Sequence, residues 1–328
     1  MLWAASAALA QDRIELRLAH GFSAAHGLHT EFLQPWAREL EQRAGVRVVV
    51  HDGKSALGAA QGMLERLIDG KVDIVHATQS DYHGTFPRTG ILEIPFVATR
   101  SDVATQALWT LRGKELKREY EGLKVLALHA HSGGVIHTVD KRVATLADLK
   151  GLRLRSPASA TSRILSAMGA TALGMPEQQI FANLKAGLID GVLASWDEAR
   201  GQRVLEGARH HVDAGLFTQP YLFAMTQKRF DTLPTAVRKA IDDLSGDALQ
   251  ARFGPWWDRW DQAAMEAART RGGTVAVLSA KERAAWMAKA APAIERYLAE
   301  LQKIGVNDAR TVYAEMKKLN KTVTKPPS

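Results

Sequence analysis

Arg155 ends the strand-like run 152–155 and is the side chain of this sequence best suited to hold an anion. Its planar guanidinium can donate two parallel, charge-assisted hydrogen bonds to a carboxylate, and its charge does not titrate in the physiological range. The alternative is a structural ion pair with a nearby Asp or Glu. Arg153 lies two residues earlier and shares a strand face with Arg155, but we expect it at the outer rim of the sheet.

Three histidines, His129, His131 and His137, form a second group able to do chemistry. An imidazole can donate a hydrogen bond, respond to pH near neutrality or bind a metal. His129 and His131 alternate onto one strand face, but no nearby carboxylate completes a metal ligand set. Roles as donors lining a site and roles as buried, hydrogen-bonded side chains both stay open. We expect no metal and no other cofactor.

The patterns that mark common catalytic sites are absent from the sequence. It contains no Cys, no Gly-x-Ser-x-Gly elbow, no Gly-rich phosphate loop and no His-Glu-x-x-His helix. Asp52, Asp73 and Asp190 are typical of caps and polar strand ends. We therefore expect a protein that is not an enzyme.

Length and charge limit the remaining classes. A chain of 328 residues predicts about two domains. Lys and Arg exceed Asp and Glu by 43 − 35 = 8, yet the basic residues are scattered, which argues against a nucleic-acid partner. Beyond the first residues, no stretch approaches the roughly 20 apolar residues of a membrane span. Direct membrane insertion is therefore not expected.

The N-terminal run Met1–Gln11 is short and apolar and ends in Ala8-Leu9-Ala10, a small-x-small pattern typical of signal-peptide cleavage. A charged start is missing, so we expect a truncated signal peptide at 1–10 and an exported mature chain. An ordinary N-terminal helix is the alternative. With no Cys after the run, a lipid anchor is not expected.

Strand-like and helix-like runs alternate from Ile14 to about Ile189, which predicts βαβ units, a mainly parallel sheet and the α/β class. The expected strands are Ile14–Ala19, Val46–Val50, Val72–Ala77, Val125–Leu128, Leu152–Arg155 and Thr171–Met175.

A short internal similarity suggests two related lobes. Leu67–Val75 and Leu184–Val192 share the order helix, glycine stop, apolar residue, Asp and strand. Ligands of open α/β sheets lie beyond the carboxyl ends of the strands. The segments after these strands, Ala77–Tyr82 and Ala194–Glu198, should therefore face each other across a cleft.

Three helical segments carry local signals. Pro35 predicts a kink or a late start in the helix 28–43. From Thr235 to about Arg271 we expect one long helix interrupted near Gly254-Pro255. Its Trp256, Trp257 and Trp260 are more typical of core packing than of a ligand platform. Ser279 to Glu282 is a capping box that opens the last major helix.

Four motifs resemble the solute receptors of tripartite ATP-independent periplasmic (TRAP) transporters. The central one is Asp148–Pro157, with the sequence Asp-Leu-Lys-Gly-Leu-Arg-Leu-Arg-Ser-Pro. The others are Glu93-Ile94-Pro95-Phe96-Val97, Gly169-Ala170-Thr171 followed by Gly174-Met175-Pro176, and Gly187-Leu188-Ile189-Asp190-Gly191. Each motif is weak alone, but together they lie in register from Ile14 to about Asn320.

The resemblance implies a two-lobed, type II-like periplasmic-binding-protein fold, a long helix spanning both lobes, and a ligand carboxylate held by Arg155. We expect the first lobe at 11–137 and about 226–262, the second at 138–225 and about 263–319, and a flexible tail at 320–328. The implied partners are a small organic carboxylate and the TRAP membrane subunits. A sensor protein as partner, or an enzyme on the same scaffold, is the alternative.

The hinge region departs from the family pattern in a way that bears on the ligand. Many relatives carry a second ligand-binding arginine there, but this chain has none between His129 and Arg142. The segment after Asp190-Gly191 is apolar and aromatic. We therefore expect a monocarboxylate with an apolar or aromatic body. The expected ligand-binding residues are Arg155, Ser195, Trp196, Thr78, Gln79, Tyr82, Phe22, His131 and His137.

Overall fold

The computed structural model describes residues 13–157 and 159–323, which form two lobes, each built on one β-sheet. The N-terminal run 1–11 and the end of the tail lie outside the described residues. The first sheet has the order β2 (Arg47–His51), β1 (Glu15–His20), β3 (Ile74–Thr78), β10 (Pro220–Thr226) and β4 (Leu123–Ala130). The second has the order β11 (Thr274–Val277), β9 (His210–Asp213), β5 (Val135–Thr138), β8 (Gly191–Ala194), β6 (Arg153–Arg155) and β7 (Thr171–Leu173).

Each sheet is mixed rather than mainly parallel. β1 pairs in parallel with β2 and β3, and β6 pairs in parallel with β7 and β8. β10 runs antiparallel to both of its neighbours, and so does β5. The antiparallel pairs follow from the path of the chain. β5 is the strand by which the chain enters the second sheet after β4, and β10 is the strand by which it returns to the first sheet after β9.

The chain crosses between the sheets at 131–134 and at 214–219. Both crossings precede the expected lobe boundaries at 137 and 225, since β5 pairs in the second sheet and β10 in the first. Gly134 lies in the first crossing, where a Cβ would come within 2.0 Å of the Phe217 ring in the other. Glycine at this position lets the two crossing segments pass closely.

Helices cover both sheets. Those beside the first are α1 (Gln34–Ala44), α2 (Met63–Ile68), α3 (Ser101–Leu111), α7 (Gln227–Asp231) and α8 (Thr235–Asp243). Those beside the second are α4 (Ser159–Ala167), α5 (Glu177–Lys185) and α6 (Trp196–Gly201). Short 3₁₀ helices are η2 (Gln79–Tyr82), η3 (Thr89–Glu93), η4 (Lys117–Tyr120), η5 (Leu146–Leu149) and η6 (Val204–Glu206).

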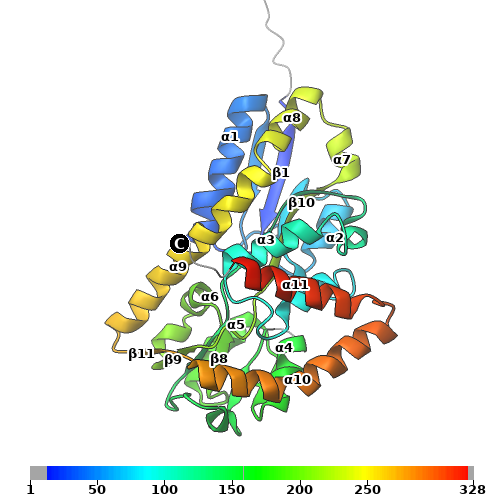
Figure 1. The fold of residues 1–328 in the computed structure, drawn as a ribbon. Coiled ribbons are helices and arrows are strands. Elements are labelled where there is room, and N and C mark those ends of the chain that lie inside the picture. The colour runs from blue at the N-terminus through cyan, green and yellow to red at the C-terminus, as the bar shows by residue number, and fades with distance from the viewer. Residues whose placement is uncertain (1–12, 158, 324–328) are drawn as a thin grey trace, which may run out of the picture.

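Three C-terminal helices tie the lobes together (Figure 1). α9 (Asp247–Thr270) packs on α3 and β4 of the first lobe and on α6 and β11 of the second. α10 (Ala280–Lys303) packs on α4, and α11 (Ala309–Val323) returns to α3 in the first lobe. In the part of the chain that the structure describes, no helix combines the length and apolar composition needed to cross a membrane.

The late helix start expected at Pro35 is confirmed. A π-helical segment, η1 (Leu28–Leu33), runs directly into α1, and Pro35 lies in the first turn of α1, where the helix changes from π-helical to α-helical hydrogen bonding.

The interruption expected at Gly254-Pro255 is wrong. The chain breaks instead between α8 and α9 at Gly246, whose φ of 62° and ψ of −132° favour glycine. The Gly246 N–H donates to the Leu126 carbonyl at 2.7 Å, which fixes the break against β4. α9 runs on through Gly254, where a Cβ would come within 2.7 Å of the Asp102 Cβ. That glycine therefore serves close packing of α9 on α3.

Candidate ligand-binding site

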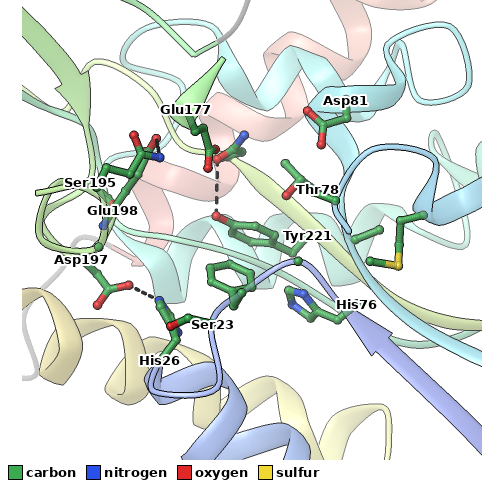
Figure 2. Close-up of a pocket in the computed structure, with 18 of the residues that line it drawn as sticks. Ser23, His26, His76, Thr78, Asp81, Glu177, Ser195, Asp197, Glu198 and Tyr221 are labelled. Carbon is green, nitrogen blue, oxygen red and sulfur yellow. Dashed lines mark hydrogen bonds and ion pairs between the residues drawn. The ribbon is translucent and has the colours of Figure 1, made fainter. Parts of the chain in front are cut away.

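One cavity of about 220 Å³ lies between the lobes, at the carboxyl ends of β1, β3 and β8 (Figure 2). The expectation that the segments after β3 and β8 face each other is confirmed, because both contribute to its wall. The lining residues are Gly21, Phe22, Ser23, His26, Ala60, Met63, His76, Ala77, Thr78, Asp81, Gln219, Tyr221 and Trp257 from the first lobe, its crossing segment and α9, and Glu177, Ser195, Asp197, Glu198, Gly201 and Gln202 from the second lobe.

Aromatic rings form the wall on the side of the first lobe. Tyr221 stacks on Trp257 with ring centroids 5.6 Å apart and on His76 at 5.3 Å, and Phe22 lies 5.8 Å from Tyr221. Trp257 also packs in the core and is 1% exposed. This wall can hold a flat apolar group by stacking.

A chain of hydrogen bonds fixes the imidazoles behind this wall. The Trp257 indole N–H donates to His129 Nδ1 at 3.1 Å, so His129 carries its proton on Nε2 and donates to His76 Nε2 at 2.7 Å. Burial lowers the pKa of both histidines well below the usual value, and each neighbouring imidazole adds to this effect. Both rings are therefore neutral and serve as fixed polar supports.

Carboxylates surround one guanidinium on the opposite side. Arg155 is 4% exposed, and its Nη1 donates to Glu198 Oε1 at 3.0 Å. Arg155 itself does not line the cavity, whereas Glu198, Glu177 and Asp81 do. Burial and then the charge of Glu198 raise the pKa of Glu177 to about 7, while Arg155 opposes the shift. Burial also raises the pKa of Asp81, again against Arg155.

One side-chain hydrogen bond joins the lobes beside the cavity. His26, after β1, contacts the Asp197 carboxylate in α6, as the dashed line in Figure 2 marks. Asp197 also accepts from Arg200 at 3.2 Å, and its backbone N–H donates to Asp261 of α9 at 2.9 Å. Residues of the segment after β1, of α6 and of α9 therefore meet at Asp197.

Of the residues expected in the site, Phe22, Thr78 and Ser195 line the cavity. Gln79 and Tyr82 do not, because η2 has about three residues per turn and Thr78 shares its face with Asp81 instead. Gln79 donates to the Tyr120 hydroxyl at 2.9 Å, and the Tyr82 hydroxyl accepts from the Leu64 N–H at 3.0 Å.

Trp196 and the two expected histidines also lie outside the cavity wall. In α6 the cavity face carries Glu198, while Trp196 packs toward the core of the second lobe, 5.1 Å from the rings of His137 and His211. His137 hydrogen-bonds His211, with 2.8 Å between the Nδ1 atoms. His131 Nε2 accepts from the Gln219 N–H at 3.3 Å. Both expected histidines are thus buried and hydrogen-bonded.

The outer position expected for Arg153 is confirmed, since it pairs with Asp190 and is partly exposed. Sequence reasoning missed His76, Asp81, Glu177, Tyr221 and Glu198. Asp81 could have been predicted from its position three residues after Thr78, on the same face of a 3₁₀ turn. Trp257, which also lines the cavity, belongs to the Trp-rich helix that the sequence analysis assigned to core packing. No group of three or more His, Cys, Asp or Glu within 13–157 and 159–323 is arranged to hold a metal ion.

Two α/β lobes that close over one cavity, with two crossing segments and a shared helix, define a two-lobed solute-binding protein. Residues 18–301 match the family described as bacterial extracellular solute-binding protein, family 7. The chain belongs to this family, which supplies the solute receptors of TRAP transporters.

Solved structures show the same fold. A marine metagenome TRAP solute-binding protein specific for aromatic acids, crystallised with 3-hydroxybenzoate, is 26% identical with a TM-score of 0.89, over 95% of this chain and 99% of that one. One from Rhodoferax ferrireducens, holding copurified benzoate, is 27% identical with a TM-score of 0.87 over the same shares. The sugar-acid-binding protein of Advenella mimigardefordensis, bound to galactonate, is 22% identical with a TM-score of 0.81, over 94% and 99% of the two chains.

Proposed function

We propose that this protein is a non-enzymatic periplasmic receptor that captures a small aromatic monocarboxylate and delivers it to TRAP membrane subunits. Secretion through the N-terminal leader is part of this proposal. The observation that carries it is an aromatic wall on one side of a cavity between two lobes and, on the other side, a buried arginine directly behind the cavity-lining Glu198. Phe22, Tyr221 and Trp257 would hold the ring, and Arg155 the carboxylate.

The size and charge of the cavity support this ligand class. Pockets for drug-sized ligands measure roughly 300–1,000 Å³, so about 220 Å³ suits a smaller molecule. A dicarboxylate would bring a second charge toward Asp81 and Glu177 with no second arginine to pair with it, which is costly in a closed site. Two solved structures at 26% and 27% identity hold 3-hydroxybenzoate and benzoate, whereas a relative 28% identical over 203 residues is a 2,3-diketo-L-gulonate-binding periplasmic protein.

Two other readings make distinct predictions. A sugar acid, as in the Advenella relative, would need hydroxyl partners, which Thr78, Ser195 and Gln202 could provide. A sensor protein could replace the transporter as partner without any change in the pocket. Adjacent genes for two membrane permease subunits would favour transport, and an adjacent histidine kinase gene would favour sensing.

A thermal-shift screen of organic acids tests the ligand class directly. A ligand that binds only the folded state adds about 2.7 kcal/mol of stability at a hundredfold excess over Kd. We expect benzoate and 3-hydroxybenzoate to raise the unfolding midpoint, and galactonate and succinate to leave it unchanged. A shift with galactonate alone would replace the aromatic ligand by a sugar acid.

Replacing Arg155 tests the proposed carboxylate contact. Arg155→Lys keeps the charge that faces Glu198 but loses the two-pronged geometry, and Arg155→Ala loses both. We expect Arg155→Ala to weaken benzoate binding by about 2–5 kcal/mol, which is thirtyfold or more. Arg153→Ala, on the same strand but paired at the rim with Asp190, is the matched control. Affinity within threefold of the parent in Arg155→Ala would refute the role of Arg155.

A further inference from the structure

Glu198 stands between Arg155 and the cavity. Its side chain belongs to the cavity wall, whereas Arg155 lies behind it and is almost fully buried. Arg155 Nη1 reaches Glu198 Oε1 at 3.0 Å, and the Arg155 Nε has no hydrogen-bond partner among the described residues. A ligand entering the cavity therefore meets the Glu198 carboxylate before it meets the guanidinium.

The position of Glu198 is held by specific contacts. Glu198 is the third residue after the N-cap Ser195, whose Oγ accepts from the Glu198 N–H at 3.2 Å. A Glu at this place commonly turns back to the N-cap backbone, but this side chain reaches Arg155 instead. The Gln202 amide donates to the same Oε1 at 3.3 Å. The helix end thus fixes the backbone, and Arg155 with Gln202 fixes the carboxylate.

We propose that Glu198 occupies the carboxylate position of Arg155 in the ligand-free protein and that ligand capture exchanges it for the carboxylate of the ligand. This inference rests on the proposed function, because it takes Arg155 as the ligand's partner. Glu198 then sets affinity, since every ligand must compete with an internal carboxylate already in place. It also disfavours anions that cannot offer Arg155 a better-aligned pair of oxygens.

Charge balance predicts a consequence of this exchange. Arg155 already faces three carboxylates, Glu198, Glu177 and Asp81, and the ligand adds a fourth. His131 and Tyr221 also feel the charge of Glu198. The neighbouring Asp197 contacts His26, Arg200 and Asp261. The pKa values of Glu177 and Asp261 are both raised to about 7, and of these two carboxyls only Glu177 lines the cavity.

The added negative charge raises the pKa of Glu177 further, so capture takes up a proton there. Benzoate binding should therefore tighten as the pH falls from 8 to 6.

Calorimetry with benzoate at pH 6 and pH 8 tests the exchange in the parent, Glu198→Gln and Glu206→Gln. Glu198→Gln keeps the backbone cap and the shape of the side chain but removes the competing charge. We expect it to bind benzoate about tenfold more tightly at pH 8, about 1.4 kcal/mol, with a smaller change between the two pH values. Glu206 pairs with Arg203 in η6 away from the cavity, so Glu206→Gln should match the parent. Thermal unfolding of all three proteins, and of Glu198→Ala, checks the fold.

The outcomes separate this inference from the proposed function. Equal benzoate affinity in the parent and Glu198→Gln would overturn the exchange and leave the receptor assignment standing. Weaker binding by folded Glu198→Gln would show that Glu198 holds Arg155 in place for the ligand, which also overturns the exchange. Binding by Glu198→Gln but not by the parent would support it. Failure of both to bind benzoate would refute the aromatic ligand class and the exchange together.

Discussion

Replacing Glu93 by Gln should change how the stability of this protein depends on pH. Glu93 is 0% exposed, Ser80 donates to its Oε1, and its Oε2 has no partner among the described residues. Burial raises the pKa of Glu93 from 4.5 to about 8; the Ser80 hydrogen bond opposes the shift and Asp81 adds to it. The carboxyl is thus neutral in the folded protein over most of the physiological range.

The sign and size of the effect follow from these pKa values. Below pH 4.5 the carboxyl is protonated in both states, and between 4.5 and 8 only the unfolded chain releases its proton. The free energy of unfolding therefore falls as the pH rises through this window. At about 1.4 kcal/mol per pH unit, the loss from pH 5 to pH 8 is on the order of 4 kcal/mol. Gln removes this loss because its side chain does not ionise.

Urea unfolding at pH 5 and pH 8 measures the effect as a difference between Glu93→Gln and the parent. Buried histidines such as His76 and His129, whose pKa values are lowered in the folded protein, take up protons in the unfolded chain within this range, but they are common to both proteins and cancel. We expect Glu93→Gln to gain stability relative to the parent as the pH rises. Exposed Glu121→Gln should show no such gain. The same stability difference at both pH values would refute a neutral, buried Glu93 carboxyl.

Two further predictions concern the fold and the aromatic wall. Gly246→Ala should lower the free energy of unfolding by about 1–3 kcal/mol, because the backbone conformation of Gly246 favours glycine. Gly84→Ala should cause no such loss, because no atom lies near the new Cβ. Equal losses of the two variants in urea unfolding would contradict this prediction. Trp257→Leu should weaken benzoate binding two- to tenfold by loss of about 0.5–1.5 kcal/mol of ring contact. Trp196→Leu should lower the unfolding midpoint and leave the benzoate affinity unchanged. If calorimetry shows the reverse, the ligand ring lies against the second lobe and not against Trp257.

Local patterns predicted the α/β class and most strands of the first half within two or three residues. The strand expected at 72–77 is observed as β3 and that at 46–50 as β2, because apolar runs and glycine stops are set by neighbours in sequence. Gly246 and Gly254 show where such patterns fail. Both are glycines in one helical region, and only contacts with Leu126 and Asp102, far away in sequence, determine which one breaks the helix.

The site was predicted at the level of segments but not of side chains. Thr78 and Ser195 line the cavity because they follow strands that end there, and their contact with a ligand stays a prediction. For the neighbouring positions the sequence analysis relies on residue type and predicts the aromatic Tyr82 and Trp196, whereas Asp81 and Glu198 line the cavity. The direction of each side chain depends on the helical turn that follows the strand, and that turn was not resolved by the sequence pattern.

Under the proposed function, the two lobes would recognise different halves of the ligand. The rings of Phe22, Tyr221 and Trp257 come from the first lobe and α9, whereas Arg155 and Glu198 belong to the second. A carboxylate without an apolar body would satisfy one lobe, and a ring without a charge would satisfy the other. Only a molecule with both an apolar ring and a carboxylate would make favourable contacts with both lobes when they close. Under the proposal, selectivity for an aromatic acid would therefore arise in this cleft without a second arginine, because the ring wall would hold the apolar half of the ligand.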